Sequence, residues 1–150
     1  MSEMHDTAKL DDLIVTTIDS IRGYENAAEH ADGARYSVFF REMAAERRDV
    51  VAALQAASRA LGGTPSDYGS TAATIHRRWE DLRTALGGGD AAIVAEVERG
   101  EDYLKEEFER VLEDERMSGE AREAVHRAYQ SVRRGHDHAR RLKHVLEDAE

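Results

Sequence analysis

The sequence is poor in three residue types that define other protein classes: its 150 residues include no cysteine, one proline and few aromatics. Without cysteine, the chain has no disulfide bond, no thiolate metal ligand and no cysteine nucleophile. One proline together with 41% hydrophobic residues is typical of a helical protein rather than a disordered or β-rich one. Because aromatics make up only 6% of the chain, the core must be built mainly from Ala, Val, Leu and Ile.

Long apolar runs are also missing. Residues 1–6 lack the basic and apolar regions of a signal peptide. No stretch approaches the roughly 20 apolar residues that span a bilayer as a helix. We therefore expect a cytoplasmic protein that does not enter the membrane.

Basic residues are in the minority. The chain has 31 Asp and Glu against 21 Lys and Arg, which gives a net charge of −10. Such a chain repels phosphate backbones, so we expect no nucleic-acid binding. Residues 122–143 are rich in Arg, whereas 101–115 is mostly acidic. Two helices with these charges largely neutralise each other when they pack side by side, so the basic run is interpreted as a pairing face.

Apolar residues recur every three or four positions, and this spacing predicts four long helices. We expect them over about residues 7–31, 36–61, 91–115 and 119–147. The first helix would leave His5 in a frayed terminus, while Asp90 and Ser118 are expected to cap the third and fourth helices. A shorter connector helix is predicted over about residues 71–86, before the glycines at 87–89.

The long segment between the second and third helices decides the predicted topology. Short loops make helices one and two antiparallel, and likewise helices three and four. A connector of roughly sixteen residues rises about 24 Å at 1.5 Å per residue, so it can carry the chain back along the bundle and make helix three parallel to helix two. We therefore predict one all-α domain over residues 1–150, a ferritin-like four-helix bundle with a long, partly helical crossover.

Two ionisable residues fall on predicted apolar seams. Glu101 lies between Val97 and Leu104, and His136 lies one turn after Val132. A buried carboxylate is costly unless it is paired or bound to a metal. The seam positions therefore point to a specific partner for each of these side chains.

Two interpretations of the seam residues are open. In the first, carboxylates and imidazoles of facing helices hold iron or manganese ions in the bundle core. In the second, Arg47 on the seam of helix two, together with Tyr24 or Tyr129, satisfies the acids in an internal polar network. Spacing alone favours neither interpretation.

The predicted connector contains the only tryptophan of the chain. His76 and Trp79 are three residues apart and share one helix face, so His76, Arg77 and Trp79 are candidates for a surface binding patch. The alternative is structural: Trp79 anchors the crossover against the core, and Arg77 pairs with acids of helix three. We prefer the structural alternative.

Five stretches then stand out together by their order and spacing. They are Gly62-Gly63-Thr64-Pro65, Gly69-Ser70, His76-Arg77-Arg78-Trp79, residues 96–102 and His136-Asp137. Their combination resembles a bacterial family of four-helix-bundle proteins of unknown function within the ferritin-like superfamily. The resemblance covers the chain from about Leu10 to Leu142 and implies a ferritin-like fold without assigning a reaction.

The resemblance also ranks the candidate metal ligands. Positions of the family pattern are matched by Glu29, Glu98, Glu101, His136 and Asp137. A centre for Fe or Mn is accordingly expected to take its ligands from Glu29, Glu46, Glu98, Glu101 and His136. Behind these ligands, Asp137 or Arg47 would orient them.

One departure argues against a standard di-iron centre. Helix two carries Glu42 and Glu46, but the positions three residues later are Ala45 and Asp49 rather than His. The Glu-x-x-His motif of the di-iron bundles is therefore missing from this helix.

Two functional hypotheses follow. The first is a ferritin-like protein that binds Fe or Mn in the bundle core and serves in metal handling or oxidative stress defence. The second is a metal-free structural or protein-interaction bundle with a buried network of carboxylate, Arg and His side chains. No catalytic residue is assigned, because no nucleophile with an adjacent base is recognisable. An exposed apolar face on the first two helices would permit a homodimer.

Overall fold

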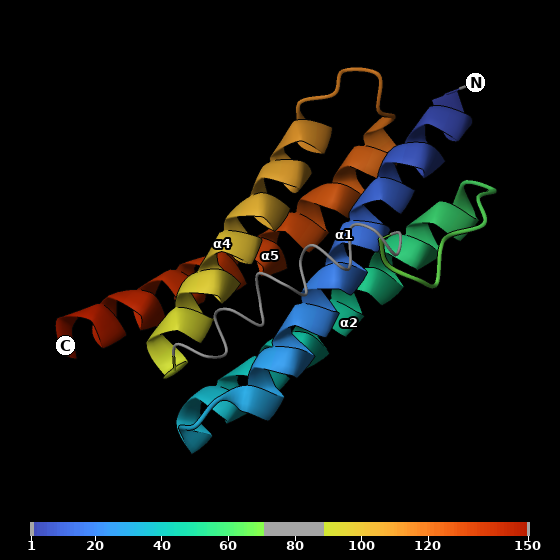
Figure 1. Ribbon diagram of the computed structural model, residues 1–150. Helices are drawn as coiled ribbons and strands as arrows, with labels where there is room; N and C mark the ends of the chain where they lie inside the picture. Colours follow the sequence, from blue (N-terminus) through green and yellow to red (C-terminus); the bar gives the residue numbers. More distant parts are fainter. Residues whose placement is uncertain (1, 71–88, 150) are drawn as a thin grey trace.

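The computed structural model describes residues 2–70 and 89–149, and every regular element in these residues is a helix (Figure 1). The helices are α1 (Ser2–His30), α2 (Ala34–Ala60), α4 (Gly89–Leu112) and α5 (Gly119–Ala149). The predicted connector over residues 71–86, with His76, Arg77 and Trp79, lies outside the described residues.

The four helices pack together as one bundle. Both α1 and α5 pack against α2 and against α4, so α1 and α5 lie diagonally opposite each other. Figure 1 shows that neighbouring helices run in opposite directions, whereas α2 and α4 run in the same direction. The end of α2 and the start of α4 therefore lie at opposite ends of the bundle. This confirms the predicted all-α four-helix bundle and the parallel orientation of its second and third long helices.

The core follows the predicted apolar seams. Its fully buried side chains include Leu10, Leu13 and Ile14 of α1, Phe40 and Leu54 of α2, Leu104 and Phe108 of α4, and Val125 and Val132 of α5. Side chains three and four residues apart share one face of a helix, and each burial of this kind contributes about 1.5–3 kcal/mol. Of the helices described, none combines the length and the apolar composition that crossing a membrane requires.

The N-terminus of α1 is more ordered than the sequence suggests. The helix begins at Ser2 rather than near residue 7. His5 is not frayed: its Nε2 lies 2.7 Å from Oδ2 of Asp114. The buried Asp6 accepts a hydrogen bond from the backbone N–H of Ser118 at 3.0 Å. These two contacts fasten α1 to the turn between α4 and α5, which lies over 100 residues away along the chain.

The predicted cap at Asp90 is wrong. Helix α4 begins one residue earlier, and the Asp90 carboxylate accepts hydrogen bonds from the backbone N–H groups of Asp32 and Gly33 at 2.8 and 2.9 Å. It thereby closes the turn between α1 and α2. Ser118 does act as predicted, since its Oγ accepts a hydrogen bond from the N–H of Ala121 at 3.2 Å.

Candidate functional site

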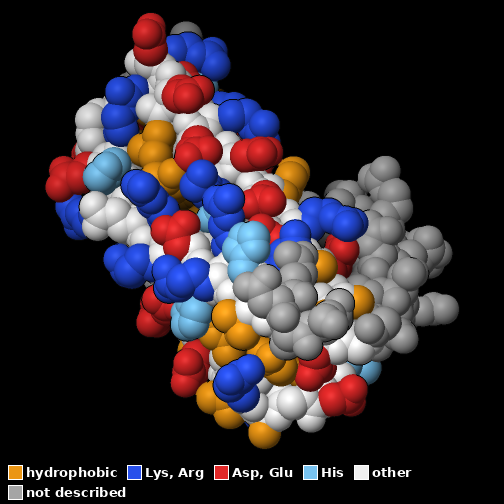
Figure 2. Space-filling view, turned by 90° about the vertical axis from the view of Figure 1, so that its left-hand side faces the viewer, with side chains coloured by type: hydrophobic (Ala, Val, Ile, Leu, Met, Phe, Trp, Pro, Cys, Tyr) orange, Lys and Arg blue, Asp and Glu red, His pale blue; other side chains and the backbone are white. Residues whose placement is uncertain are grey.

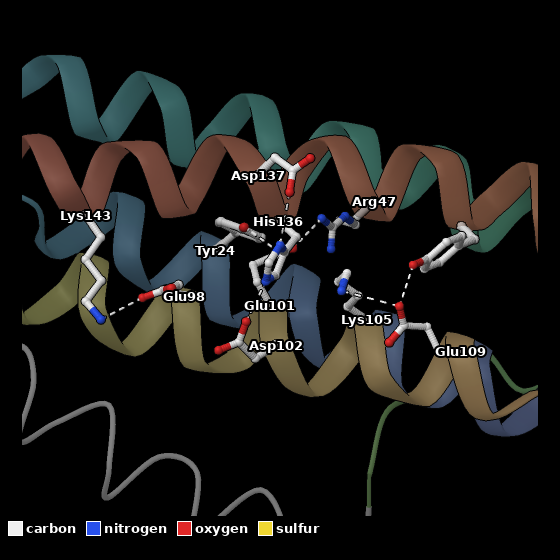
Figure 3. Close-up of polar contacts among 11 residues, drawn as sticks. Tyr24, Arg47, Glu98, Glu101, Asp102, Lys105, Glu109, His136, Asp137 and Lys143 are labelled. Carbon is white, nitrogen blue, oxygen red and sulfur yellow. Dashed lines mark hydrogen bonds and ion pairs between the residues drawn. The ribbon is translucent and has the colours of Figure 1, made fainter.

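Three buried polar side chains meet in the middle of the bundle. The guanidinium of Arg47 donates a hydrogen bond to Oε2 of Glu101 at 2.8 Å, and the hydroxyl of Tyr24 donates one to Oε1 at 2.5 Å (Figure 3). The exposed fractions of Arg47, Glu101 and Tyr24 are 0%, 1% and 3%. We call these three residues the core network, and both carboxylate oxygens of Glu101 are engaged in it.

The sequence brings the core network together through three helices. Arg47 of α2 lies one turn after Met43 on a face that is otherwise apolar. Glu101 occupies the equivalent place on α4, one turn before Leu104. Tyr24 continues the seam of α1 after Ile21. The contacts of Glu101 with both Arg47 and Tyr24 place these three seam positions at the same height in the bundle.

Burial and the contacts within the core network determine which of its side chains are charged. Burial, and then the charge of Glu101, raise the pKa of Tyr24 well above its usual value, so the phenol remains a neutral donor. Burial by itself lowers the pKa of Arg47. The neighbouring Glu101 carboxylate, together with smaller contributions from Tyr24 and Glu46, outweighs burial and raises that pKa above its usual value. The network therefore contains one positive charge, one negative charge and a neutral hydroxyl that all complement one another.

Gly135 of α5, the fourth helix, packs against the core network. A Cβ atom at Gly135 would collide with Nη2 of Arg47 and with Cε of Met43. The guanidinium therefore lies directly against the backbone of α5. Its Nη1 lies 3.5 Å from Oγ of Ser20, and its Nε has no hydrogen-bond partner among the described residues.

His136 lies next to the core network but forms a separate set of contacts. Its Nε2 lies 2.5 Å from Oδ1 of Asp102, and its Nδ1 lies 3.3 Å from Oδ1 of Asp137. The imidazole is buried, whereas both carboxylates are about half exposed. His136 is therefore held between two surface acids, and Figure 3 shows this set of contacts beside the core network.

The remaining predicted metal ligands are dispersed. The Glu98 carboxylate forms an ion pair with Nζ of Lys143 at 2.8 Å, Glu46 is half-buried between α2 and α5, and Glu29 is exposed in the last turn of α1. Within residues 2–70 and 89–149, no three His, Asp or Glu side chains are grouped as metal ligands would be. The structure thus brings Glu101 to Arg47, but it does not gather the predicted set around one point.

Sequence reasoning missed three residues of this region. Asp102 and Lys143 are on exposed or half-exposed faces, where charged residues are the rule, so no signal marks them as partners of His136 and Glu98. Gly135 did carry a signal. A glycine in the interior of an otherwise good helix costs about 1 kcal/mol and usually has a packing reason.

A second tyrosine and carboxylate pair lies further along the α4–α5 interface. The hydroxyl of Tyr129 donates a hydrogen bond to Oε2 of Glu109 at 2.6 Å, and Nζ of Lys105 lies 3.3 Å from the same oxygen. Burial and this hydrogen bond raise the pKa of Tyr129 to about 12, and the same hydrogen bond lowers the pKa of Glu109. Tyr129 therefore belongs to a peripheral pair and not to the core network.

The raised pKa values of these two tyrosines predict that the folded chain loses stability at alkaline pH. Because the pKa values of Tyr24 and Tyr129 are raised in the folded chain, the unfolded chain releases those protons first, near pH 10. The free energy of unfolding should then fall as the pH rises from about 10 through 12. Urea unfolding at a series of pH values, with phenolate absorbance of native and denatured protein, measures this. A stability that stays level over this range in the wild type would contradict it.

The family model described as a domain of unknown function, DUF2383, matches residues 6–114. The chain belongs to this family. No curated protein matches the sequence.

The DUF2383 match covers α1, α2 and α4 and ends before α5. Tyr24, Arg47 and Glu101 all lie inside the matched residues, whereas Gly135 and His136 lie beyond them. The family model thus contains the core network but not the helix that closes it, and its description assigns no activity to either part.

Proposed function

We propose that this DUF2383 chain is a metal-free interaction bundle, in which the guanidinium of Arg47 takes the place that a core metal ion would have. One observation carries the proposal: both oxygens of the buried Glu101 are engaged, one by Arg47 and one by Tyr24. The carboxylate is thereby neutralised by a permanent cation of the chain itself.

The donor groups do not fit a two-metal centre. Such a centre needs carboxylates from facing helices and two imidazoles with free nitrogen atoms. Here Glu101 is engaged by Arg47, Glu98 by Lys143, and each ring nitrogen of His136 faces a carboxylate. To bind an ion at Glu101, Arg47 would have to withdraw and stay buried without its counter-charge, which typically costs 3–5 kcal/mol.

The topology supports a place for the family in the ferritin-like superfamily. Parallel α2 and α4 lie diagonally across the bundle, and the end of α2 and the start of α4 lie at opposite ends of it. Ferritin-like folds have one crossover of this kind, whereas up-down-up-down bundles have none. In this proposal the family keeps the fold and replaces the core metal site with the core network.

The outer surface is where such a bundle would act. No member of the core network is more than 3% exposed, so none of them can touch a substrate in the folded chain. The network instead ties α1, α2 and α4 together at one height and specifies which helix faces meet. We infer that function lies in contacts made by the outer faces of the helices, with a second copy of the chain among the expected partners.

Metal loading tests the proposal. Purified protein is incubated anaerobically with Fe(II) or Mn(II), desalted and analysed for metal content, in parallel with the Glu101→Gln and His136→Ala variants. We expect substoichiometric metal in all three proteins and an unchanged melting temperature of the wild type after loading.

The opposite outcome is equally clear. Metal near one equivalent or more per wild-type chain, and loss of that metal in Glu101→Gln, would overturn the proposal. The function would then be metal handling or oxidative stress defence through Glu101 and His136. The oligomeric state of the same samples, by light scattering, tests the expected homodimer.

A further inference from the structure

A polar groove runs between α2 and α5, on the far side of Gly135 from the bundle interior. Its volume is about 340 Å³, within the range of small-molecule sites. It is lined by Met43, Glu46, Arg134, Gly135, Asp137, His138 and Arg141. Figure 2 shows the mixed character of the surface on one side of the molecule, with Lys, Arg and His side chains among acidic ones.

Three nitrogen-bearing side chains of α5 line the groove at helical spacing. Arg134, His138 and Arg141 are four and three residues apart and therefore share one face of the helix. The His138 ring packs on Phe39 of α2, with ring centroids 4.4 Å apart. Both guanidiniums are exposed, and neither Arg134 nor Arg141 has a hydrogen-bond or ion-pair partner among the residues that the structure describes.

Two acids, Glu46 and Asp137, also line the groove. The Glu46 carboxylate contributes to the field that keeps the buried Arg47 charged. The Asp137 carboxylate faces Nδ1 of His136 at 3.3 Å. Asp137 thus has a partner in His136, and the two guanidiniums of Arg134 and Arg141 are opposed in the groove by one further acid, Glu46.

The floor of the groove lies close to the buried core network. Gly135 and Met43 line the groove, and a Cβ atom added at Gly135 would collide with Nη2 of Arg47. The backbone of Gly135 thus lies between the groove and the buried guanidinium of Arg47.

We propose that this α2–α5 groove binds a small oxyanion, a phosphate or carboxylate group of a soluble metabolite, through Arg134 and Arg141 with His138 between them. Guanidinium groups match such oxyanions with paired hydrogen bonds. The inference deepens the proposed function by naming a ligand class for the outer surface, and it rests on an intact core network under the groove floor.

Calorimetric titration with inorganic phosphate and with succinate tests the inference. The two probes distinguish binding of a phosphate group from binding of a carboxylate group. The chain offers a matched control, because Arg133 and Arg140 adjoin the groove arginines on the same helix but do not line the groove. We expect saturable binding of at least one probe to the wild type. Arg134→Gln with Arg141→Gln should weaken it by about tenfold or more, whereas Arg133→Gln with Arg140→Gln should change it less than about twofold.

Three results decide the matter. Absence of saturable binding of either probe to the folded wild type would overturn the inference, and so would equal weakening by both double variants, which indicates diffuse attraction to α5. Tighter binding in Glu46→Gln, which removes an acid from the groove, would support it. A core metal found in the loading experiment would refute the proposed function but leave arginine-dependent oxyanion binding as a separate, measurable result.

Discussion

Replacing Glu101 by Ala is expected to lower the free energy of unfolding by about 3–5 kcal/mol, enough to remove much of the stability of a domain of this size. The substitution leaves the guanidinium of Arg47 buried without its counter-charge and the hydroxyl of Tyr24 without its acceptor. Both groups would keep the desolvation cost of burial and lose the contact that offsets it.

Urea unfolding of the variant beside a matched surface substitution measures this effect. Glu25 also forms an ion pair with an arginine of α2, Arg48, at 3.0 Å, but both side chains are more than half exposed. Glu25→Ala should therefore cost no more than about 1 kcal/mol. Equal, small losses in the two variants would show that the core network is not closed as the structure has it.

The triple replacement of Arg47 by Met, Glu101 by Leu and Tyr24 by Phe separates stability from specificity. An apolar core of similar volume is often as stable as a buried ion pair, or more stable by about 1–4 kcal/mol. If the triple variant is as stable as the wild type while Glu101→Ala is not, the network specifies how the helices meet rather than adding net stability.

The second large effect is expected at Gly135. Gly135→Ala should destabilise the chain by about 1–3 kcal/mol, because the added methyl group collides with the guanidinium of Arg47 and the end of Met43 in a closely packed interior. The helix propensity of alanine offsets part of this cost.

Gly100 is the matched control for this substitution. It is also a glycine inside a helix, but a Cβ atom there would meet nothing within 4 Å. Gly100→Ala should stabilise the chain by about 0.5–1 kcal/mol. Opposite signs at the two glycines, measured as midpoints of urea unfolding, are the expected result. Stabilisation by both substitutions would contradict the close contact between α5 and Arg47.

Most of the fold could be predicted from the sequence because helix periodicity is a local property. Spacings of three and four between residues such as Leu10, Leu13 and Ile14 mark a buried face without reference to any other helix. The length of the connection between the second and third long helices then restricted their relative direction. The errors are at helix ends, where Asp90 and His5 make contacts with distant turns that no local pattern reveals.

For the candidate site, the sequence by itself determined that Arg47, Glu101 and His136 each interrupt an apolar seam, and all three are buried. Only the tertiary structure decided their partners. Glu101 accepts hydrogen bonds from Arg47 and Tyr24, which are 54 and 77 residues away along the chain. His136 instead contacts Asp102. The heights and rotations of separate helices set these pairings. A shift of one turn, about 5.4 Å, exchanges one partner for another while leaving every seam unchanged.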